Sequence, residues 1–183
     1  MMTPFKNKIL ITGGAGFVGS TMVDKLIENP DNFVLTIDNL STGNIKRLPE
    51  TNLHNNWKFI KCDVNSYRDI AAIMTSYKFD YVFHYAAVVG VKRTLENPVS
   101  VLNDINGFKY LLDLSKNTGV KRIFFSSSSE VYGRTPEEYL PIDESVPFHP
   151  ASPYSISKIG TDLLAKFYFE AYGLKTLITR MFT

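Results

Sequence analysis

A tyrosine and a lysine near the C-terminal end of the sequence are spaced so that they could act as a proton-transfer pair. Tyr154 and Lys158 are four residues apart, which puts both on one face of a helix. A tyrosine with a pKa of about 10 is a poor base, but a neighbouring ammonium would stabilise its phenolate and lower that pKa. Tyr154 could then take the proton of a hydroxyl group, and a serine of residues 126–129 could orient the reacting oxygen.

A glycine-rich segment near the N-terminus predicts a binding site for a dinucleotide. Residues 13–19 read Gly-Gly-Ala-Gly-Phe-Val-Gly and lie between a short β-branched run and a stretch with helical periodicity. In this context one glycine makes a tight turn, one lets the backbone approach a pyrophosphate, and one lets the helix pack on the strand. The dipole and free amides at the start of the helix favour the phosphates. A positively charged nicotinamide held there would also lower the pKa of Tyr154.

Asp38 ends the second apolar run and indicates which dinucleotide would bind. A carboxylate at this place can accept hydrogen bonds from both hydroxyls of the adenosine ribose, and it repels a 2′-phosphate. Residues 39–43 contain no arginine that could bind such a phosphate. The sequence therefore predicts NAD as the cofactor, in preference to NADP.

Each of these residues also has an ordinary structural explanation. Taken alone, Tyr154 and Lys158 are more often a pair on a helix surface, residues 126–129 are a polar loop, and Glu130 is a surface carboxylate. The glycines alone could form an ordinary loop and Asp38 a turn. Because ligands of open α/β sheets bind beyond the carboxyl ends of strands, and both polar segments follow predicted strands, their joint placement favours the functional interpretation.

Hydrophobic periodicity predicts the elements that position these residues. Ser152 and Pro153 form a good N-cap and N1 pair, and Gly119 and Gly173 follow predicted helices at places that favour a left-handed residue. The predicted strands are residues 8–12, 33–37, 57–62, 81–84, 121–126 and 174–180. The predicted helices are residues 17–28, 67–77, 99–117 and 153–172. The predicted buried face of the third helix contains Leu102, Ile105, Phe108 and Leu112.

Continuous apolar strands that alternate with helices indicate the α/β class, with a doubly wound parallel sheet of the Rossmann type. A length of 183 residues suits one domain, so we expect a single dinucleotide-binding domain over residues 1–183. Residues 133–151 contain four prolines and form the one long irregular stretch. A loop of that length inside a compact domain is usually functional.

Composition and charge argue against several classes of function. The chain has 20 basic and 18 acidic side chains, a formal charge of +2 and scattered basic residues, so nothing favours a nucleic-acid or membrane partner. Cys62 is the single cysteine, lies at a predicted buried strand end and fits a reducing cytoplasm. Neither a signal peptide nor a membrane span is expected, and no metal site is predicted.

Together the motifs resemble those of the extended short-chain dehydrogenases/reductases that act on nucleotide-linked sugars. The resemblance covers essentially the whole chain. The matching segments are residues 12–19 (the TGxxGxxG loop), 38–43 (ribose-binding), 62–64 (adenine-binding), 84–87 (the wall of the nicotinamide channel), 126–133 (the catalytic strand end) and 154–158 (YxxxK), with Asn103 matching an asparagine that steadies the fold near the cofactor.

The resemblance implies roles for individual residues. Ser128 takes the catalytic Ser/Thr position, Tyr154 is the base, Lys158 is its partner, and Glu130 is a candidate acid/base group. The implied cofactor-binding residues are Gly13, Gly16, Phe17, Val18, Gly19, Asp38, Asn39, Ser41, Thr42, Gly43, Asp63, Val64, Tyr85, Ala86, Ala87, Val88, Asn103, Ser126, Tyr154 and Lys158.

The resemblance implies a reaction that begins by oxidising a sugar at C4, after which the 4-keto sugar epimerises, loses water or loses carbon dioxide. Ser129 and Glu130 stand where glucose dehydratases of the family show Asp-Glu, and are similar to the Ser-Glu of UDP-glucuronate decarboxylases and GDP-mannose dehydratases. The latter prefer NADP, which disagrees with Asp38. Residues 88–98 look more like those of UDP-glucuronate 4-epimerases. We expect a UDP-sugar 4-epimerase or decarboxylase.

Members of this family are typically much longer than 183 residues, and their C-terminal part binds the nucleotide sugar. We therefore expect the substrate-binding half to be missing, and Thr183 stands where the family usually has asparagine. The alternative is a nicotinamide-binding regulatory module without turnover, but such modules often lack the tyrosine and lysine present here. The resemblance also implies a homodimer formed through the helices at residues 99–117 and 153–172.

Overall fold

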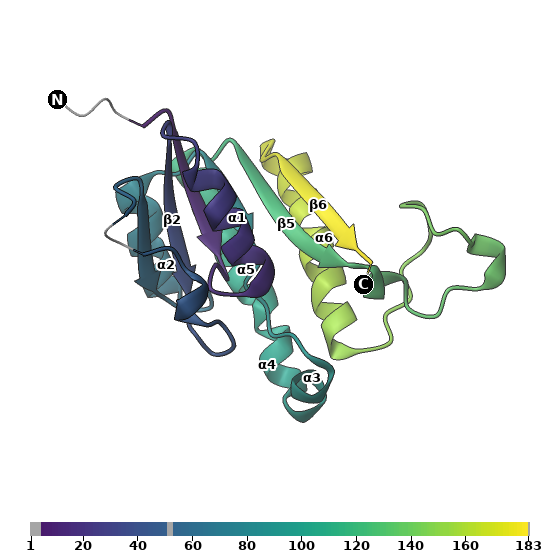
Figure 1. Cartoon of the computed structure of the whole chain (residues 1–183). Helices are drawn as coiled ribbons and strands as arrows, with labels where there is room; N and C mark the ends of the chain where they lie inside the picture. Colours follow the sequence, from purple (N-terminus) through teal and green to yellow (C-terminus); the bar gives the residue numbers. More distant parts are fainter. Residues whose placement is uncertain (1–4, 51–52, 183) are drawn as a thin grey trace.

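The computed structural model describes residues 5–50 and 53–182 and shows a six-stranded sheet with helices on both faces (Figure 1). The strands lie in the order β3-β2-β1-β4-β5-β6, and all neighbouring strands are parallel. The predicted doubly wound parallel sheet of the Rossmann type is confirmed. The strands are β1 (Asn7–Thr12), β2 (Asn32–Asp38), β3 (Trp57–Lys61), β4 (Tyr81–His84), β5 (Arg122–Ser128) and β6 (Thr176–Met181).

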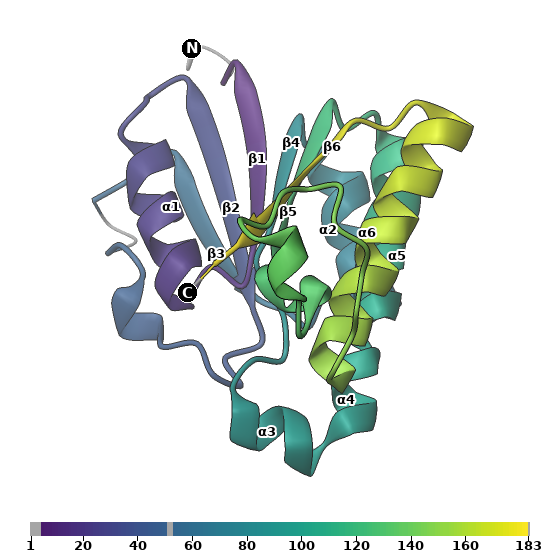
Figure 2. The same ribbon diagram turned by 90° about the vertical axis from the view of Figure 1, so that its right-hand side faces the viewer.

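Helices cover the sheet in two layers (Figure 2), with α1 on one face and α2, α5 and α6 on the other. The helices are α1 (Phe17–Ile27), α2 (Tyr67–Tyr77), α3 (Val91–Glu96), α4 (Pro98–Leu102), α5 (Asp104–Thr118) and α6 (Pro153–Tyr172), with short 3-10 turns η1 (Ile45–Arg47), η2 (Ser129–Tyr132) and η3 (Glu137–Tyr139). None of the helices among the described residues is long and apolar enough to cross a membrane.

The order of the strands fixes where a ligand can bind. The chain runs outward from β1 to β3, then returns to place β4 on the other side of β1, where Ile9 pairs with Tyr81. The connections after β1 and β4 therefore leave the sheet in opposite directions. This arrangement opens a crevice at the carboxyl ends of the two central strands, which is where doubly wound sheets bind their ligands.

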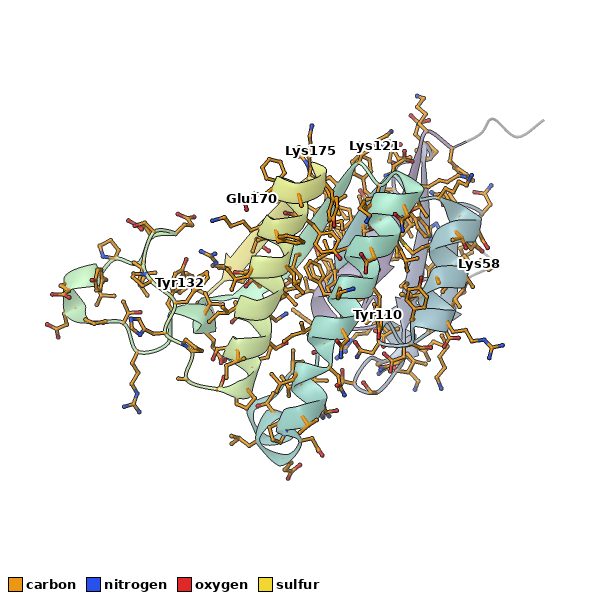
Figure 3. All side chains as sticks on the ribbon, turned by 180° about the vertical axis from the view of Figure 1, so that it is seen from behind. Lys58, Tyr110, Lys121, Tyr132, Glu170 and Lys175 are labelled. Atoms are coloured by element: carbon orange, nitrogen blue, oxygen red, sulfur yellow. The ribbon has the colours of Figure 1, made fainter. Side chains whose placement is uncertain are left out.

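The larger core cluster lies between the sheet and the layer of α2, α5 and α6. Phe108 is fully buried in it, with its ring centre 5.3 Å from the ring of His84 and 4.5 Å from that of Phe125. Figure 3 shows this layer from its outer side, with Tyr110 on α5. A smaller cluster packs α1 against the opposite face through Val23 and Trp57.

Most predicted elements agree with the structure to within two residues, but the single helix at residues 99–117 is wrong. The chain ends α4 at Leu102 and begins α5 at Asp104. The Asn103 amide bonds back to the Val99 carbonyl, whereas Asp104 accepts the Val88 amide at 2.7 Å. Asn103 keeps helical backbone angles, with φ −63° and ψ −22°, so the break between the two helices is one residue long. The predicted burial of Leu102 is also wrong, because this side chain is exposed, and α3 was not predicted.

The last helix begins and ends as predicted. Ser152 and Ser155 form a capping box at the start of α6, and Pro153 is its first residue. Gly173 and Gly119 have φ angles of 70° and 82°, the left-handed values expected after a helix. The irregular stretch at residues 133–151 is confirmed, with only the turn η3 inside it.

Replacing Phe108 by alanine tests the larger core. We expect Phe108→Ala to lower the free energy of unfolding by about 3–5 kcal/mol, because the missing ring leaves a cavity between α5 and the sheet. Urea unfolding followed by circular dichroism measures the change. Phe169→Ala on the exposed side of α6 is the control and should cost less than about 1 kcal/mol. Equal losses in the two variants would contradict this description of the core.

Candidate active site

A pocket of about 330 Å³ opens where β1, β2, β4 and β5 end. Most residues predicted to bind cofactor or substrate line it. They are Gly13, Gly16, Phe17, Val18, Gly19, Asp38, Asn39, Ser41, Thr42, Asp63, Val64, Tyr85, Ala86, Ala87, Val88, Ser126, Ser128, Tyr154 and Lys158. The predicted residues outside its lining are Gly43, Asn103 and Glu130.

The glycine loop lies against the end of β4. Gly13 has a φ of +69°, and a side chain there would collide with the backbone of Tyr85 and Ala86. A side chain on Gly19 would overlap the carbonyl oxygen of Gly13, so this glycine lets α1 pack closely on the loop. Gly16 is the N-cap of α1, without a side-chain cap or an acidic residue in the first turn. The amides at this helix start are therefore available to an anion.

Asp38 is held at the end of β2 with its carboxylate in the pocket. Its Oδ2 accepts the Ala15 amide at 3.0 Å and its Oδ1 accepts the Leu40 amide at 2.8 Å. Gly43 packs against this carboxylate, and a Cβ there would lie 2.7 Å from Asp38 Oδ1. Each carboxylate oxygen keeps a second lone pair, so a ribose hydroxyl could still donate to it.

Polar groups continue the pocket beyond Asp38. Asp63 follows β3, accepts the Asn65 amide at 2.9 Å, and lies 3.4 Å from the side-chain nitrogen of Asn39. A second, more polar pocket of about 550 Å³ adjoins this end and shares all three of these residues in its lining. Asn103 lies there, exposed at the junction between α4 and α5.

Tyr154 and Lys158 meet the end of β5 at the bottom of the same pocket. Lys158 Nζ is buried, donates a hydrogen bond of 2.7 Å to the Ser126 carbonyl, and lies 5.5 Å from the centre of the Tyr154 ring. The hydroxyl of Ser128 is close enough to Tyr154 to lower the pKa of its phenol. The capping box at Ser152 fixes the first turn of α6 and with it the position of Tyr154.

The ionisation of this pair differs in part from the expectation. Burial raises the pKa of Tyr154, and the charges of Glu130 and Asp104 raise it further, while only Ser128 opposes them. Desolvation of the phenolate therefore dominates in the cofactor-free chain, and the lowering expected with bound nicotinamide stays a prediction. Burial lowers the pKa of Lys158 to about 8, although Asp104 and Asp162 raise it.

Glu130 lies beside the site without lining it. It is exposed, follows Ser128 in the turn η2, and accepts a hydrogen bond of 3.3 Å from the Ser152 hydroxyl. Its charge reaches Tyr154, whose pKa it raises. The structure therefore brings together Ser128, Tyr154 and Lys158, with Glu130 outside this group.

Sequence reasoning assigned no individual role to three polar groups around the site, although it placed His84 in the wall of the nicotinamide channel. Asp104 lines the pocket next to Lys158, although its neighbour Asn103 was predicted. His84 shares a hydrogen bond of 2.7 Å with Thr12, and burial lowers its pKa to about 3, which keeps the ring neutral. The sequence predicted a single helix from residue 99, and inside it Asp104 looked like an ordinary polar position, so it gave no distinct signal.

The third missed group is a buried ion pair that links α6 to β6. Arg180 Nε donates to Asp162 Oδ2 at 3.0 Å, and Arg180 Nη1 donates to the Tyr132 hydroxyl at 2.8 Å. The guanidinium also lies over the rings of Tyr132 and Phe148, with centres 5.5 Å and 4.8 Å away. Figure 3 shows Tyr132 between α6 and the loop at residues 133–151. This pair holds η2, which follows Ser128, against the sheet.

Comparison with known proteins agrees with this geometry. The family model described as GDP-mannose 4,6 dehydratase matches residues 10–183. The UDP-glucuronate 4-epimerase of Thermodesulfobacterium geofontis is 37% identical, over 95% of this chain and 55% of its own length. The solved UDP-N-acetylglucosamine 4-epimerase of Methanobrevibacter ruminantium, in complex with UDP-N-acetylmuramic acid, is 39% identical with a TM-score of 0.86, over 96% of this chain and 54% of its own.

A third similar protein was solved with the predicted cofactor. The UDP-glucose 4-epimerase of Thermus thermophilus, in complex with NAD, is 31% identical with a TM-score of 0.84, over 94% of this chain and 54% of its own. The chain thus spans about half the length of the relatives it matches. The family model, the relatives and the fold agree, and the chain belongs to the NAD-dependent nucleotide-sugar epimerase/dehydratase family.

Proposed function

We propose that this chain is the cofactor-binding part of an NAD-dependent UDP-sugar 4-epimerase, which oxidises a sugar at C4 and reduces it again. One observation carries the proposal. Ser128, Tyr154 and Lys158 converge on the pocket that the glycine loop and Asp38 also line. The relatives that act on UDP-linked sugars support a UDP-sugar as the substrate class.

The residues of the pocket fit NAD. The free amides at the start of α1 would hold the pyrophosphate, Asp38 would accept hydrogen bonds from the adenosine ribose, and Asp63 and Val64 would contact the adenine. The negative charge of Asp38 would repel a 2′-phosphate on that ribose. Bound NAD supplies an acceptor for the hydride of a sugar C–H bond.

Tyr154 would act as the base for the C4 hydroxyl of the sugar, and Ser128 would orient the reacting oxygen. Because burial raises the pKa of Tyr154 in the cofactor-free chain, it needs a further positive charge before it can accept the proton. Lys158 is anchored on the Ser126 carbonyl, so its ammonium stays in the pocket at neutral pH. The raised pKa of Tyr154 and the fixed ammonium of Lys158 would together restrict deprotonation of Tyr154 to the site with NAD bound.

The position of Glu130 favours epimerisation over the other branches. Epimerisation at C4 requires only removal and return of a proton and a hydride, whereas loss of water requires a further acid or base in the site. Glu130 is the acidic residue that the resemblance makes a candidate acid/base group, and it lies outside the pocket against Ser152. A decarboxylase of UDP-glucuronate is the second candidate, favoured by the Ser129-Glu130 pair of the sequence.

A regulatory module that binds NAD without turnover is the alternative from another class. Such a module needs the glycine loop and Asp38, but it has no use for a buried ammonium. Burying Lys158 opposes folding, as the drop of its pKa to about 8 shows. A side chain that destabilises the fold and lines the pocket favours an enzyme.

We also propose a homodimer in a reducing cytoplasm. The resemblance places the dimer interface on two predicted helices. The first corresponds to α4 and α5 of the structure, and the second corresponds to α6. Leu163 and Phe167 on α6 are 54% and 53% exposed, and Val99 on α4 is 72% exposed, which suits a helical interface. The buried, unpaired thiol of Cys62 suits a reducing compartment.

Exchanging Asp38 for alanine tests the cofactor assignment. We expect wild-type chain to bind NAD more tightly than NADP in calorimetry. Asp38→Ala should lower that preference about 10- to 100-fold, because it removes charge-assisted hydrogen bonds of about 1.5–3 kcal/mol and the repulsion of a phosphate. Asp24→Ala, an exposed residue of α1, is the control. Absence of heat with either nucleotide in the wild type would contradict the proposed function.

Two variants test the branch of the reaction. We expect Tyr154→Phe to reduce epimerisation of a UDP-sugar about 10²- to 10⁴-fold, the usual contribution of a positioned base, while Glu130→Gln keeps most of the turnover. The assay joins residue 183 to the C-terminal half of the Thermodesulfobacterium relative and follows the 4-epimer by chromatography. Loss of turnover in Glu130→Gln, with NAD binding intact, would favour a dehydratase or decarboxylase.

Lys158→Met tests whether the buried ammonium opposes folding. The pKa of Lys158 falls from 10.5 unfolded to about 8 folded, so the penalty is complete below pH 8 and disappears between pH 8 and 10.5. We expect a gain in unfolding free energy of about 2–3 kcal/mol at pH 7, once a lost hydrogen bond of about 1 kcal/mol is subtracted. Urea unfolding at pH 7 and 10 should show this gain shrinking. Lys166→Met, an exposed position of α6, is the control.

A further inference from the structure

Asp104 connects three segments that meet at the pocket. Its Oδ2 accepts the Val88 amide at 2.7 Å, which ties the segment after β4 to the first turn of α5. Its Oδ1 lies 3.4 Å from the side-chain nitrogen of Asn65, in the segment after β3. The carboxylate itself is largely buried and lines the pocket. One side chain thus joins the ends of two strands to a helix.

The contact with Asp104 determines how the side-chain amide of Asn65 is oriented. The amide nitrogen of Asn65 faces Asp104, whereas its oxygen is buried without a hydrogen-bond partner and lies against Gly107. A buried oxygen without a partner destabilises the fold. The amide is held this way because turning it over would direct its oxygen at the carboxylate. Gly107 lacks a Cβ, which leaves room for the side chain.

A close crossing of α5 and α6 puts Asp104 beside Lys158. Gly160 on α6 lies so near Ile105 that a Cβ would be 3.1 Å from the Ile105 Cδ1. Asp104 precedes Ile105 and Lys158 lies two residues before Gly160, so both side chains enter the pocket next to this crossing. Burial raises the pKa of Asp104 and lowers that of Lys158, and the charge of each residue partly opposes the shift of the other.

The geometry points to a positioning role for Asp104, whose carboxylate ties the Val88 segment to α5 and holds a negative charge against the Lys158 ammonium. The tie keeps the backbone of one pocket wall in place. The charge favours the protonated form of the lysine, which burial disfavours. The part that this plays in catalysis rests on the proposed function, whereas both effects are properties of the cofactor-free chain.

The other charges near the pair are few. Asp63 faces Asp104 from the segment after β3 and opposes its ionisation. Asp162 faces Lys158 from its own helix, but it already holds Arg180. His84, beneath the pocket, is neutral. Removing Asp104 therefore leaves Lys158 with Asp162 as the remaining carboxylate that supports its charge.

Asp104→Asn and Asp104→Ala separate the two effects. Asparagine keeps an oxygen for the Val88 amide, and its new amide can donate to Asn65 once that side chain turns, but it carries no charge. Alanine removes both the acceptor and the charge. Asp113→Asn makes the same substitution on α5 away from the pocket, where Asp113 contacts Lys109 and Tyr168, and is the matched control.

The first measurement is a carbon-13 NMR titration of lysine side chains in the cofactor-free chain, with the Lys158 signal identified by its absence in Lys158→Met. We expect the Lys158 midpoint near pH 8 in the wild type and in Asp113→Asn, and a lower midpoint in both Asp104 variants, because loss of a negative neighbour disfavours the ammonium. A merely structural role would leave Asp104→Asn at the wild-type midpoint, and that result would overturn the proposal.

The second measurement is hydrogen exchange of the Val88 amide in the same samples. Asp104→Asn should keep this amide protected, and Asp104→Ala should speed its exchange at least about tenfold, since local opening no longer breaks a hydrogen bond. An unchanged exchange rate of the Val88 amide in Asp104→Ala would contradict the proposal that Asp104 holds the Val88 segment on α5. Neither readout needs NAD, so a failure to bind NAD in calorimetry would count against the proposed function and leave this inference to its own tests.

Discussion

The backbone of Gly13 lies directly against that of Tyr85 and Ala86, and the rest of the site depends on this contact. It joins the loop after β1 to the segment after β4, the two strands between which the sheet changes direction. Thr12 reinforces the junction, since its hydroxyl accepts the Ala86 amide at 3.3 Å and bonds His84. A larger residue at position 13 would separate the wall that binds phosphate from the wall that faces the reacting groups.

The chemistry of the pocket is set by how its charges are buried. The ammonium of Lys158 is removed from water and receives one carbonyl and two nearby carboxylates in return. These partners compensate only part of the desolvation, so the fold loses stability at the place where it needs reactivity. Burial also keeps the phenol of Tyr154 neutral, because it raises the pKa of this group. A positively charged cofactor bound beside it would favour the phenolate.

The sequence predicted the framework better than the details of the site. Strand and helix patterns with marked turn residues, such as Gly119 and Gly173, gave the elements and the parallel sheet, because local propensity and tertiary packing agree there. The break at Asn103 could not be predicted, since the hydrophobic period continues across it and Asn103 itself keeps helical backbone angles. Motif spacing predicted that Ser128, Tyr154 and Lys158 share one pocket, but it contained no information on desolvation, which raises the pKa of Tyr154 in the cofactor-free chain.

The parallel order of the strands also affects how the chain folds as it is synthesised. β1 leaves the ribosome well before one of its two neighbours, β4, which follows some seventy residues later, as the pairing of Ile9 with Tyr81 shows. Until then, the side of β1 that will meet β4 has no partner, and its apolar residues are exposed to other chains. Emergence of β4 therefore closes the centre of the sheet and, in the same step, brings Gly13 to Ala86.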